Sequence, residues 1–235
     1  MRKLLRRVPW VHRFYSESRY LLQIAREVFL TDPVAMNDRS HLDGEWNFGA
    51  GPDKDRWQRV LALVNEVRGS RWGDVLEIGC AAGLITEEIA THADRLVAGD
   101  ISPVARARAA ERLRSATHVN IIALDLQRDA LGLQDVVFAM DVLEFVHGRG
   151  RLRRTISKLA SAVRPGGLLV VSICRYSPDI RDAWWQRWVP EGADGVLPLI
   201  GSCPEFDRIH CEPHPADGKP IPGYLDHFIA IFRKK

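Results

Sequence analysis

Residues 75–90 read "VLEIGCAAGLITEEIA", a short apolar run followed by a turn of small residues and then by the spacing of a helix. A strand, a glycine-rich turn and a helix in this order open a βαβ unit, and small residues let a ligand approach the backbone. Glu77 interrupts the apolar run, although unpaired acids are rarely buried. The stretch therefore predicts a ligand-binding turn at 79–83, next to an acid that would suit a cationic ligand.

The alternation of short apolar runs with helical spacing continues along the chain. Predicted strands cover 74–79, 95–100, 119–125, 135–141 and 167–175, and predicted helices cover 54–67, 83–93, 103–115 and 149–163. The last two apolar runs, 206–213 and 224–232, have no helix between them and predict an antiparallel pair. We therefore expect a doubly wound α/β fold, with a mostly parallel seven-stranded sheet, helices on both faces, an antiparallel C-terminal edge and an N-terminal helical extension.

The chain has 235 residues, which fits one α/β domain with additions. We expect a basic N-terminal helical arm and a lid or linker at 1–53, and a Rossmann-like domain at 54–235. Residues 31–53 are rich in turn formers and break the helical pattern. Residues 1–30 hold seven basic and two acidic side chains, a net charge of +5. Such an arm can contact an anionic membrane or pack on the domain, and we favour packing.

Other patterns exclude several classes of protein. No apolar run approaches the roughly 20 residues of a membrane span, and the charged start lacks the apolar core of a secretory signal. The four cysteines form no CxxC pair, which predicts reduced thiols in a cytoplasmic protein. The cysteines and histidines at 203–214 lack zinc-site spacing, so we expect no metal. The arginines at 106–114 and 151–154 predict solvated helix faces, not a nucleic-acid surface.

Acids follow the predicted strands at the edge where doubly wound sheets bind ligands. Asp100, Asp125 and Asp141 end the second, third and fourth strands. Asp100 stands 17 residues after Gly83, about the interval at which an acid binds ribose hydroxyls in dinucleotide folds. Leu84 replaces the third glycine of the dinucleotide fingerprint, which disfavours an NAD-dependent reductase, and no P-loop lysine follows. A nucleoside-bearing ligand other than NAD fits this pattern.

These residues resemble the class I S-adenosylmethionine-dependent methyltransferases. The resemblance covers about 55–235 and comprises five motifs in order: "EIGCAAG" (77–83), "DISP" (100–103), "DL" (125–126), "AMDVLEFV" (139–146) and "VRPGGLLVVS" (163–172). It implies S-adenosylmethionine as the cofactor. The implied cofactor-binding residues are Glu77, Gly79, Cys80, Ala81, Gly83, Asp100, Ile101, Asp125, Leu126 and Asp141.

The "GCAAG" form of the first motif resembles that of the nodulation-type N-methyltransferases, which act on amines of small saccharide-like or metabolite substrates. Ala81 replaces the middle glycine of the wider family, and we expect alanine to be tolerated there if its φ is negative. The resemblance implies that Glu77 lies near the sulfonium and amino group of the cofactor, through the amides of the turn or a water molecule.

Methyl transfer requires in-line alignment, together with a base where the acceptor must lose a proton. Asp141, Glu144 and His147 are the candidate catalytic residues, and each could instead be a solvated or capping residue. His210 and His227, in the last two strands, are weaker candidates that point into the pocket or lie on the sheet surface.

Aromatic residues stand where substrate contacts are expected. Trp184, Trp185 and Trp188 follow the fifth strand, where they could stack on a sugar or a methylated cation, or pack against the N-terminal arm. Trp46 and Phe48 are candidates for a lid over the cofactor.

The sequence thus predicts a methyltransferase that acts on an amine or hydroxyl of a small or carrier-linked sugar-like metabolite, with N-methylation favoured. One alternative is an O-methyltransferase acting on a lipid-linked saccharide or natural product, with the basic arm touching the membrane. Another is a non-catalytic S-adenosylmethionine-binding partner protein. The acceptor is not fixed by the sequence, because the loops that would bind it obey few general rules.

Overall fold

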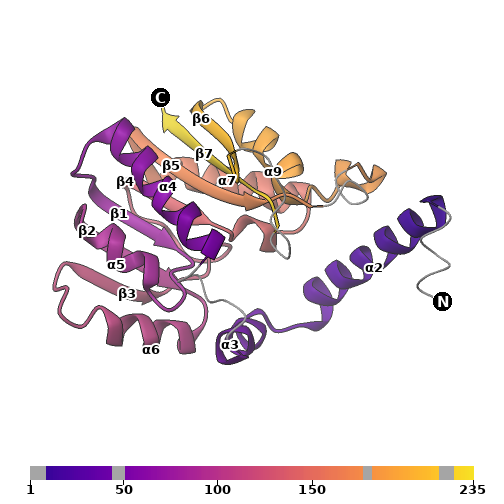
Figure 1. The fold of residues 1–235 in the computed structure, drawn as a ribbon, viewed down its shortest axis with the longest axis horizontal. Coiled ribbons are helices and arrows are strands. Elements are labelled where there is room, and N and C mark those ends of the chain that lie inside the picture. Colours follow the sequence, from indigo (N-terminus) through magenta and orange to yellow (C-terminus); the bar gives the residue numbers. More distant parts are fainter. Residues whose placement is uncertain (1–8, 44–50, 177–181, 217–224) are drawn as a thin grey trace.

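The structure is a computed structural model that describes residues 9–43, 51–176, 182–216 and 225–235. Its centre is a seven-stranded sheet of order β3-β2-β1-β4-β5-β7-β6 (Figure 1). The strands are β1 (Gly73–Ile78), β2 (Ala93–Asp100), β3 (Val119–Ala123), β4 (Gln134–Met140), β5 (Val163–Cys174), β6 (Phe206–His214) and β7 (His227–Lys234). All pairs are parallel except β5–β7 and β6–β7, which confirms the predicted fold class.

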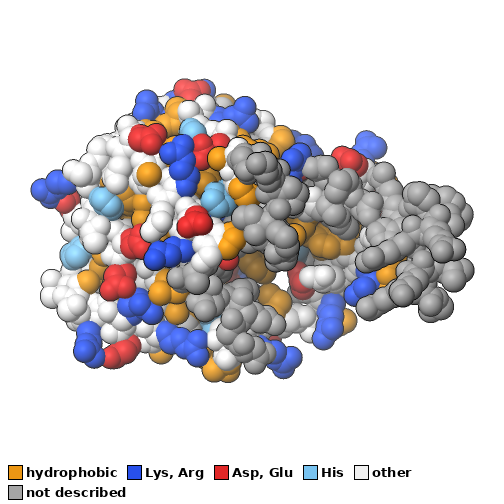
Figure 2. Space-filling model, in the orientation of Figure 1, with side chains coloured by type: hydrophobic (Ala, Val, Ile, Leu, Met, Phe, Trp, Pro, Cys, Tyr) orange, Lys and Arg blue, Asp and Glu red, His pale blue; other side chains and the backbone are white. Residues whose placement is uncertain are grey.

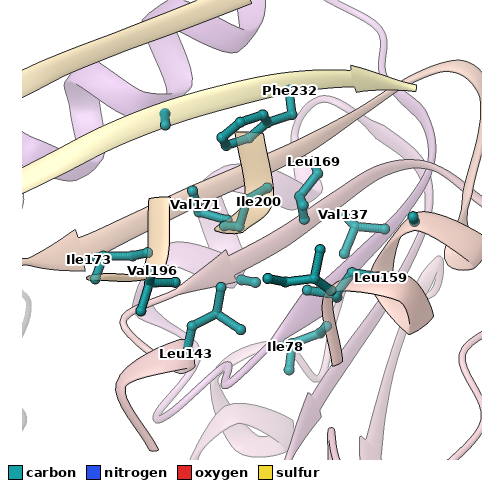
Figure 3. Packing of buried hydrophobic residues seen from close by; sticks show 14 of the residues in the cluster. Ile78, Val137, Leu143, Leu159, Leu169, Val171, Ile173, Val196, Ile200 and Phe232 are labelled. Carbon is teal, nitrogen blue, oxygen red and sulfur yellow. The ribbon is translucent and has the colours of Figure 1, made fainter. Parts of the chain in front are cut away.

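Helices cover both faces of the sheet, because neighbouring strand residues point to opposite sides. Val75 and Leu168 join the core beneath α4, α5 and α6. Leu76 and Leu169 join the core beneath α7 and α9, part of which is shown in Figure 3. The helices are α4 (Gly51–Arg68), α5 (Leu84–Ala90), α6 (Pro103–Arg112), α7 (Arg149–Ala162) and α9 (Gly192–Gly201).

The sequence pattern did not predict α9. Its glycines and Pro198 resemble a loop, whereas its apolar residues pack on the sheet. Val196 and Ile200 lie one turn apart and are almost fully buried. Tertiary packing therefore outweighs a poor helix propensity in this segment.

Helices α2 (Pro9–Leu30) and α3 (Pro33–Asp43) lie before α4 in the chain. The expectation that residues 31–53 break the helical pattern is wrong for α3. The Val34 amide donates to Asp32 Oδ1 at 2.9 Å, so Asp32 acts as a helix cap with a proline directly after it. The domain division at residue 53 stays a prediction. Within the described residues, none of the helices combines the length and apolar character needed to cross a membrane.

A buried arginine anchors α4 to the carboxyl ends of β4 and β5. Arg56 has no exposed surface, and its Nη1 donates to Asp141 Oδ1 at 2.9 Å and to Ser172 Oγ at 2.7 Å. Its Nη2 lies 2.7 Å from Asp141 Oδ2, so the guanidinium holds both carboxylate oxygens. The position of α4 therefore depends on this pair.

Replacing Arg56 with methionine should lower the free energy of unfolding by about 3–5 kcal/mol, because the Asp141 charge would lose its buried partner. Arg59→Met is the matched control, since Arg59 lies on the same helix and pairs with Glu212 but is 39% exposed. That change should cost about 1 kcal/mol or less. Chemical denaturation of both variants measures the difference, and equal losses would contradict the account.

Candidate active site

The turn between β1 and α5 is fastened to the end of β2. The Gly79 amide donates to the Gly99 carbonyl at 2.7 Å, and the Ala81 amide donates to Asp100 Oδ2 at 3.0 Å. Gly79 and Gly83 have φ angles of 81° and 77°, which favour glycine. The predicted ligand-binding turn is thus present, with small residues between two strands that both end there.

Asp100 is 6% exposed, and its Oδ1 also accepts a hydrogen bond from the Ser102 amide at 2.8 Å. Each carboxylate oxygen therefore has one backbone donor and keeps a further lone pair that can accept from a hydroxyl. Arg106 Nη1 donates to the carbonyls of both Asp100 and Ile101 at 2.9 Å. This carboxylate suits the two hydroxyls of a ribose.

Three of the arginines at 106–114 are exposed, as expected for a solvated face, whereas Arg106 is half-buried. Besides Arg106, Arg112 Nε donates to the Ala82 carbonyl at 3.1 Å, so two arginines support the backbone of the site. The face in Figure 2 intersperses acidic, basic and histidine side chains. Among the described residues on that face, basic and acidic side chains are mixed, as on an ordinary protein surface.

Glu77 is 3% exposed, and its Oε2 has no hydrogen bond to any described residue. Burial raises its pKa to about 7, and the Asp100 charge adds to this rise, while the Thr86 hydroxyl opposes it. A cationic group at this point would supply the missing partner and favour the carboxylate. The residues present therefore fit a ligand that carries positive charge.

Asp125 and Leu126 follow β3 at the same edge of the sheet. Asp125 Oδ1 accepts from the Gln127 amide at 2.8 Å, which fixes the turn. Leu126 is buried, and its carbonyl accepts from Lys158 Nζ at 2.8 Å. An apolar wall beside a carboxylate can hold a flat heterocycle that carries an amino group.

Two of the predicted catalytic acids meet where β4 and β5 end. Asp141 is held by Arg56 and Ser172, and Glu144 Oε1 accepts from the Cys174 amide at 2.9 Å. Glu144 Oε2 is buried and makes no hydrogen bond with any residue that the structure describes. Burial raises the pKa of Glu144 to about 8, and the neighbouring Asp141 charge adds to the rise. Glu144 is thus a carboxyl group with an oxygen available for a proton.

The two histidines of the last two strands lie in different parts of the structure. His227 Nε2 lies 3.8 Å from Asp141 Oδ1, and the side chain is almost fully buried. His210 Nε2 instead lies 3.0 Å from Glu212 Oε2, away from these acids. His227 therefore belongs to the site, whereas His210 belongs to the edge of the sheet.

His147 connects the N-terminal helix with the domain. Its Nδ1 lies 2.8 Å from Glu191 Oε1, and its Nε2 lies 3.1 Å from Glu27 Oε2 of α2. Burial by itself would lower the pKa of His147, but the hydrogen bonds and charges of Glu191 and Glu27 outweigh it and raise the pKa above 6.5. Both ring nitrogens are thus engaged, and the predicted catalytic role stays a prediction.

The tryptophans after β5 separate into two kinds. Trp185, in η2 (Trp184–Arg187), is 3% exposed and stacks on Tyr20 of α2 at 5.7 Å between ring centroids. Trp184 is 68% exposed and contacts the Trp188 ring edge-on. Trp185 therefore packs beneath the arm, and Trp184 is available to a ligand. Trp46 and Phe48 lie outside the described residues.

Helix α3 contributes a part of the site that sequence reasoning missed. Asp38 Oδ1 accepts a hydrogen bond from Ser102 Oγ, next to Asp100. Arg108 Nη1 of α6 donates to the His41 carbonyl at 2.7 Å, and His41 is buried. The Asp32–Pro33 helix start was the one sequence signal for this element.

The fold and the site define a class I S-adenosylmethionine-dependent methyltransferase. Residues 36–217 match the family model of nodulation protein S, NodS. Nodulation protein S of Rhizobium tropici is 28% identical over 167 residues, 70% of this chain and 67% of that protein. The Bradyrhizobium diazoefficiens protein is 28% identical over 174 residues, 72% of this chain and 79% of that protein. The chain therefore belongs to the NodS family and is a methyltransferase of that type.

Solved structures agree with this assignment. The N-methyltransferase NodS from Bradyrhizobium japonicum WM9 is 27% identical, with a TM-score of 0.64 over 78% of this chain and 96% of that chain. The same protein in complex with S-adenosylhomocysteine has a TM-score of 0.70 at 24% identity, over 84% of this chain and 98% of that chain. These structures share the sheet and the arrangement of its helices.

The condition under which alanine was expected to be tolerated at 81, a negative φ, is not met, because the φ of Ala81 is 48°. A non-glycine residue there costs about 1–2 kcal/mol, which the Asp100 hydrogen bond offsets. Ala81→Gly should raise the free energy of unfolding by only about 0.5–1 kcal/mol, because the greater freedom of glycine in the unfolded chain cancels part of the relieved strain. Ala82 does not have a positive φ, so Ala82→Gly should lower the free energy of unfolding by a similar amount. Urea denaturation tests both, and destabilisation by Ala81→Gly would contradict the interpretation.

The bridge from His147 to Glu27 and Glu191 should make stability depend on pH. Because the pKa of His147 is raised on folding, its contribution is complete below about pH 6.5 and is lost as pH rises through the folded-state value. The difference in melting temperature between wild type and His147→Gln should therefore be largest near pH 6 and shrink toward pH 9. Circular dichroism melts measure it, and a difference independent of pH would refute the assignment.

Proposed function

We propose that this protein transfers a methyl group from S-adenosylmethionine to an amine of a saccharide-like acceptor, either small or carried on a larger molecule. The observation that carries the proposal is the available Glu144 oxygen at the ends of β4 and β5. The solved NodS relative from Bradyrhizobium japonicum WM9 is an N-methyltransferase, which supports the choice of an amine.

The described residues are suited to hold the cofactor in one orientation. Asp100 would accept from the ribose hydroxyls, and Asp125 with Leu126 would flank the adenine. Glu77 would balance the positive charge of the methionine part, beside the bare backbone of 79–83. S-adenosylmethionine supplies a methyl group that is already activated by its sulfonium. The protein then has to align the acceptor and receive a proton.

Proton removal falls to Glu144 in this proposal. The acceptor nitrogen forms its bond to the methyl carbon as the bond from sulfur to that carbon breaks, and the amine proton passes to the Glu144 carboxylate. A carboxyl group with a pKa of about 8 is well matched to an amine near neutral pH. Asp141 is engaged by Arg56 and would act by position and charge, with His227 beside it.

Glu144→Gln keeps an oxygen that can accept from the Cys174 amide but cannot take a proton. We expect kcat to fall by about 10²–10⁴-fold, with S-adenosylhomocysteine affinity unchanged. In the wild type kcat should rise with pH up to about 8, because the carboxylate form increases, and the variant should lose this rise. Glu88→Gln, at an exposed acid of α5, is the control. A variant with the wild-type rate and pH profile would exclude Glu144 as the base.

The acceptor class is tested with labelled S-adenosylmethionine and pairs of oligosaccharides. Glucosamine oligosaccharides with a free amine should be methylated on nitrogen, and the matched N-acetylated forms should not react. Lipid-linked and free forms of the same saccharide would then show whether a carrier is needed. Label that is found on oxygen alone would reject the proposal.

O-methylation is the second candidate, favoured by a specific likeness. The ubiquinone biosynthesis O-methyltransferase of Caulobacter sp. strain K31 is 32% identical over 128 residues, half of each chain. The same acceptor assay with hydroxyl-bearing compounds that lack an amine separates the two. Transfer to these compounds at the rate found for amino sugars would favour this candidate.

A further inference from the structure

Helix α2 has an outer face that combines apolar and basic side chains. Tyr15, Leu22 and Phe29 stand seven residues apart, on one side of the helix, and are 42%, 70% and 78% exposed. Arg19 and Arg26 lie between them and are exposed too. These five residues are called the outer face of α2. In Figure 1 the helix projects from the rest of the molecule.

The acids of α2 lie on the opposite side of the helix. Glu17, Tyr20, Ile24 and Glu27 share the spacing of the inner face. Tyr20 stacks on Trp185, Ile24 is buried against the same cluster, and Glu27 meets His147. Docking therefore turns both acids of α2 inward and leaves its outer face with arginines and no acid.

The chemistry of the outer face fits an anionic lipid surface. Residues 1–30 carry a net charge of +5 in the sequence, which would make two copies of this arm repel each other. A helix with basic and apolar residues on one face can lie in the plane of a lipid interface. Trp184 and Trp188 are exposed on the segment against which α2 packs, and the Arg187 guanidinium lies 4.7 Å from the Trp188 ring centroid. Tryptophan is favoured at membrane–water interfaces.

We propose that the outer face of α2 binds an anionic lipid surface, with the helix lying parallel to it. The inner face of the same helix contacts His147 through Glu27, so binding would place this part of the domain near the lipid. This inference does not depend on the identity of the acceptor.

The test is co-sedimentation of the full chain with vesicles of phosphatidylglycerol and phosphatidylcholine, compared with phosphatidylcholine alone. We expect binding to the anionic vesicles, weakened by salt. Leu22→Gln with Phe29→Gln should weaken it at least tenfold, and each of Arg19→Gln and Arg26→Gln about fivefold.

Two matched controls separate this face from general surface effects. Leu133→Gln removes a leucine that is 56% exposed just before β4, and Arg114→Gln removes an exposed arginine beyond the end of α6. Both should bind anionic vesicles like the wild type. Binding of S-adenosylhomocysteine by every variant checks folding, and the proposed acceptor plays no part in the readout.

Three results would overturn the proposal. The first is no sedimentation of the wild type with anionic vesicles at low salt. The second is equal binding by the outer-face variants. The third is that the wild type binds no lipid but self-associates, and that Leu22→Gln abolishes the self-association. The outer face of α2 would then join two copies of the chain.

Discussion

One carboxylate, that of Asp100, holds the site together. It is buried at the end of β2 and receives the amides of Ala81 and Ser102, so it fixes both the turn before α5 and the start of α6. Ser102 also caps α6 and bonds to Asp38, which ties α3 to the same point. A buried carboxylate requires such hydrogen-bond donors. Because these donors are backbone amides, the hydrogen bonds fix the position of the backbone around the site. Ala81 has its left-handed φ because its amide donates to this carboxylate.

Three acids near the strand ends have different surroundings and so suit different tasks. Asp141 is ion-paired with Arg56 and shares Ser172 with it. Glu77 and Glu144 have raised pKa values because burial is not balanced by a full set of partners. Environment rather than residue type thus separates a fixed charge from groups that can meet a cation or take a proton. This division would serve the proposed methyl transfer to an amine.

The sequence predicts those features that depend on local period and spacing. The strands, the turn at 79–83 and the acid at Asp100 follow from apolar alternation and from the interval between motifs. The pair between Arg56 and Asp141 joins residues 85 positions apart, and no local pattern reports it. His147 illustrates the same limit, since its partners lie in α2 and before α9. Helix α3 was missed for another reason, because Asp32–Pro33 is both a turn signal and a helix start.

The central claim is that the Asp100 edge of the sheet binds the nucleoside of S-adenosylmethionine. Calorimetric titration with S-adenosylhomocysteine tests it most directly, with wild type and Asp100→Ala in parallel and NADH as the control ligand. The account predicts micromolar-range binding by the wild type, a large loss in the variant at unchanged secondary structure, and no binding of NADH. Failure of the wild type to bind, or equal binding by Asp100→Ala, would contradict it.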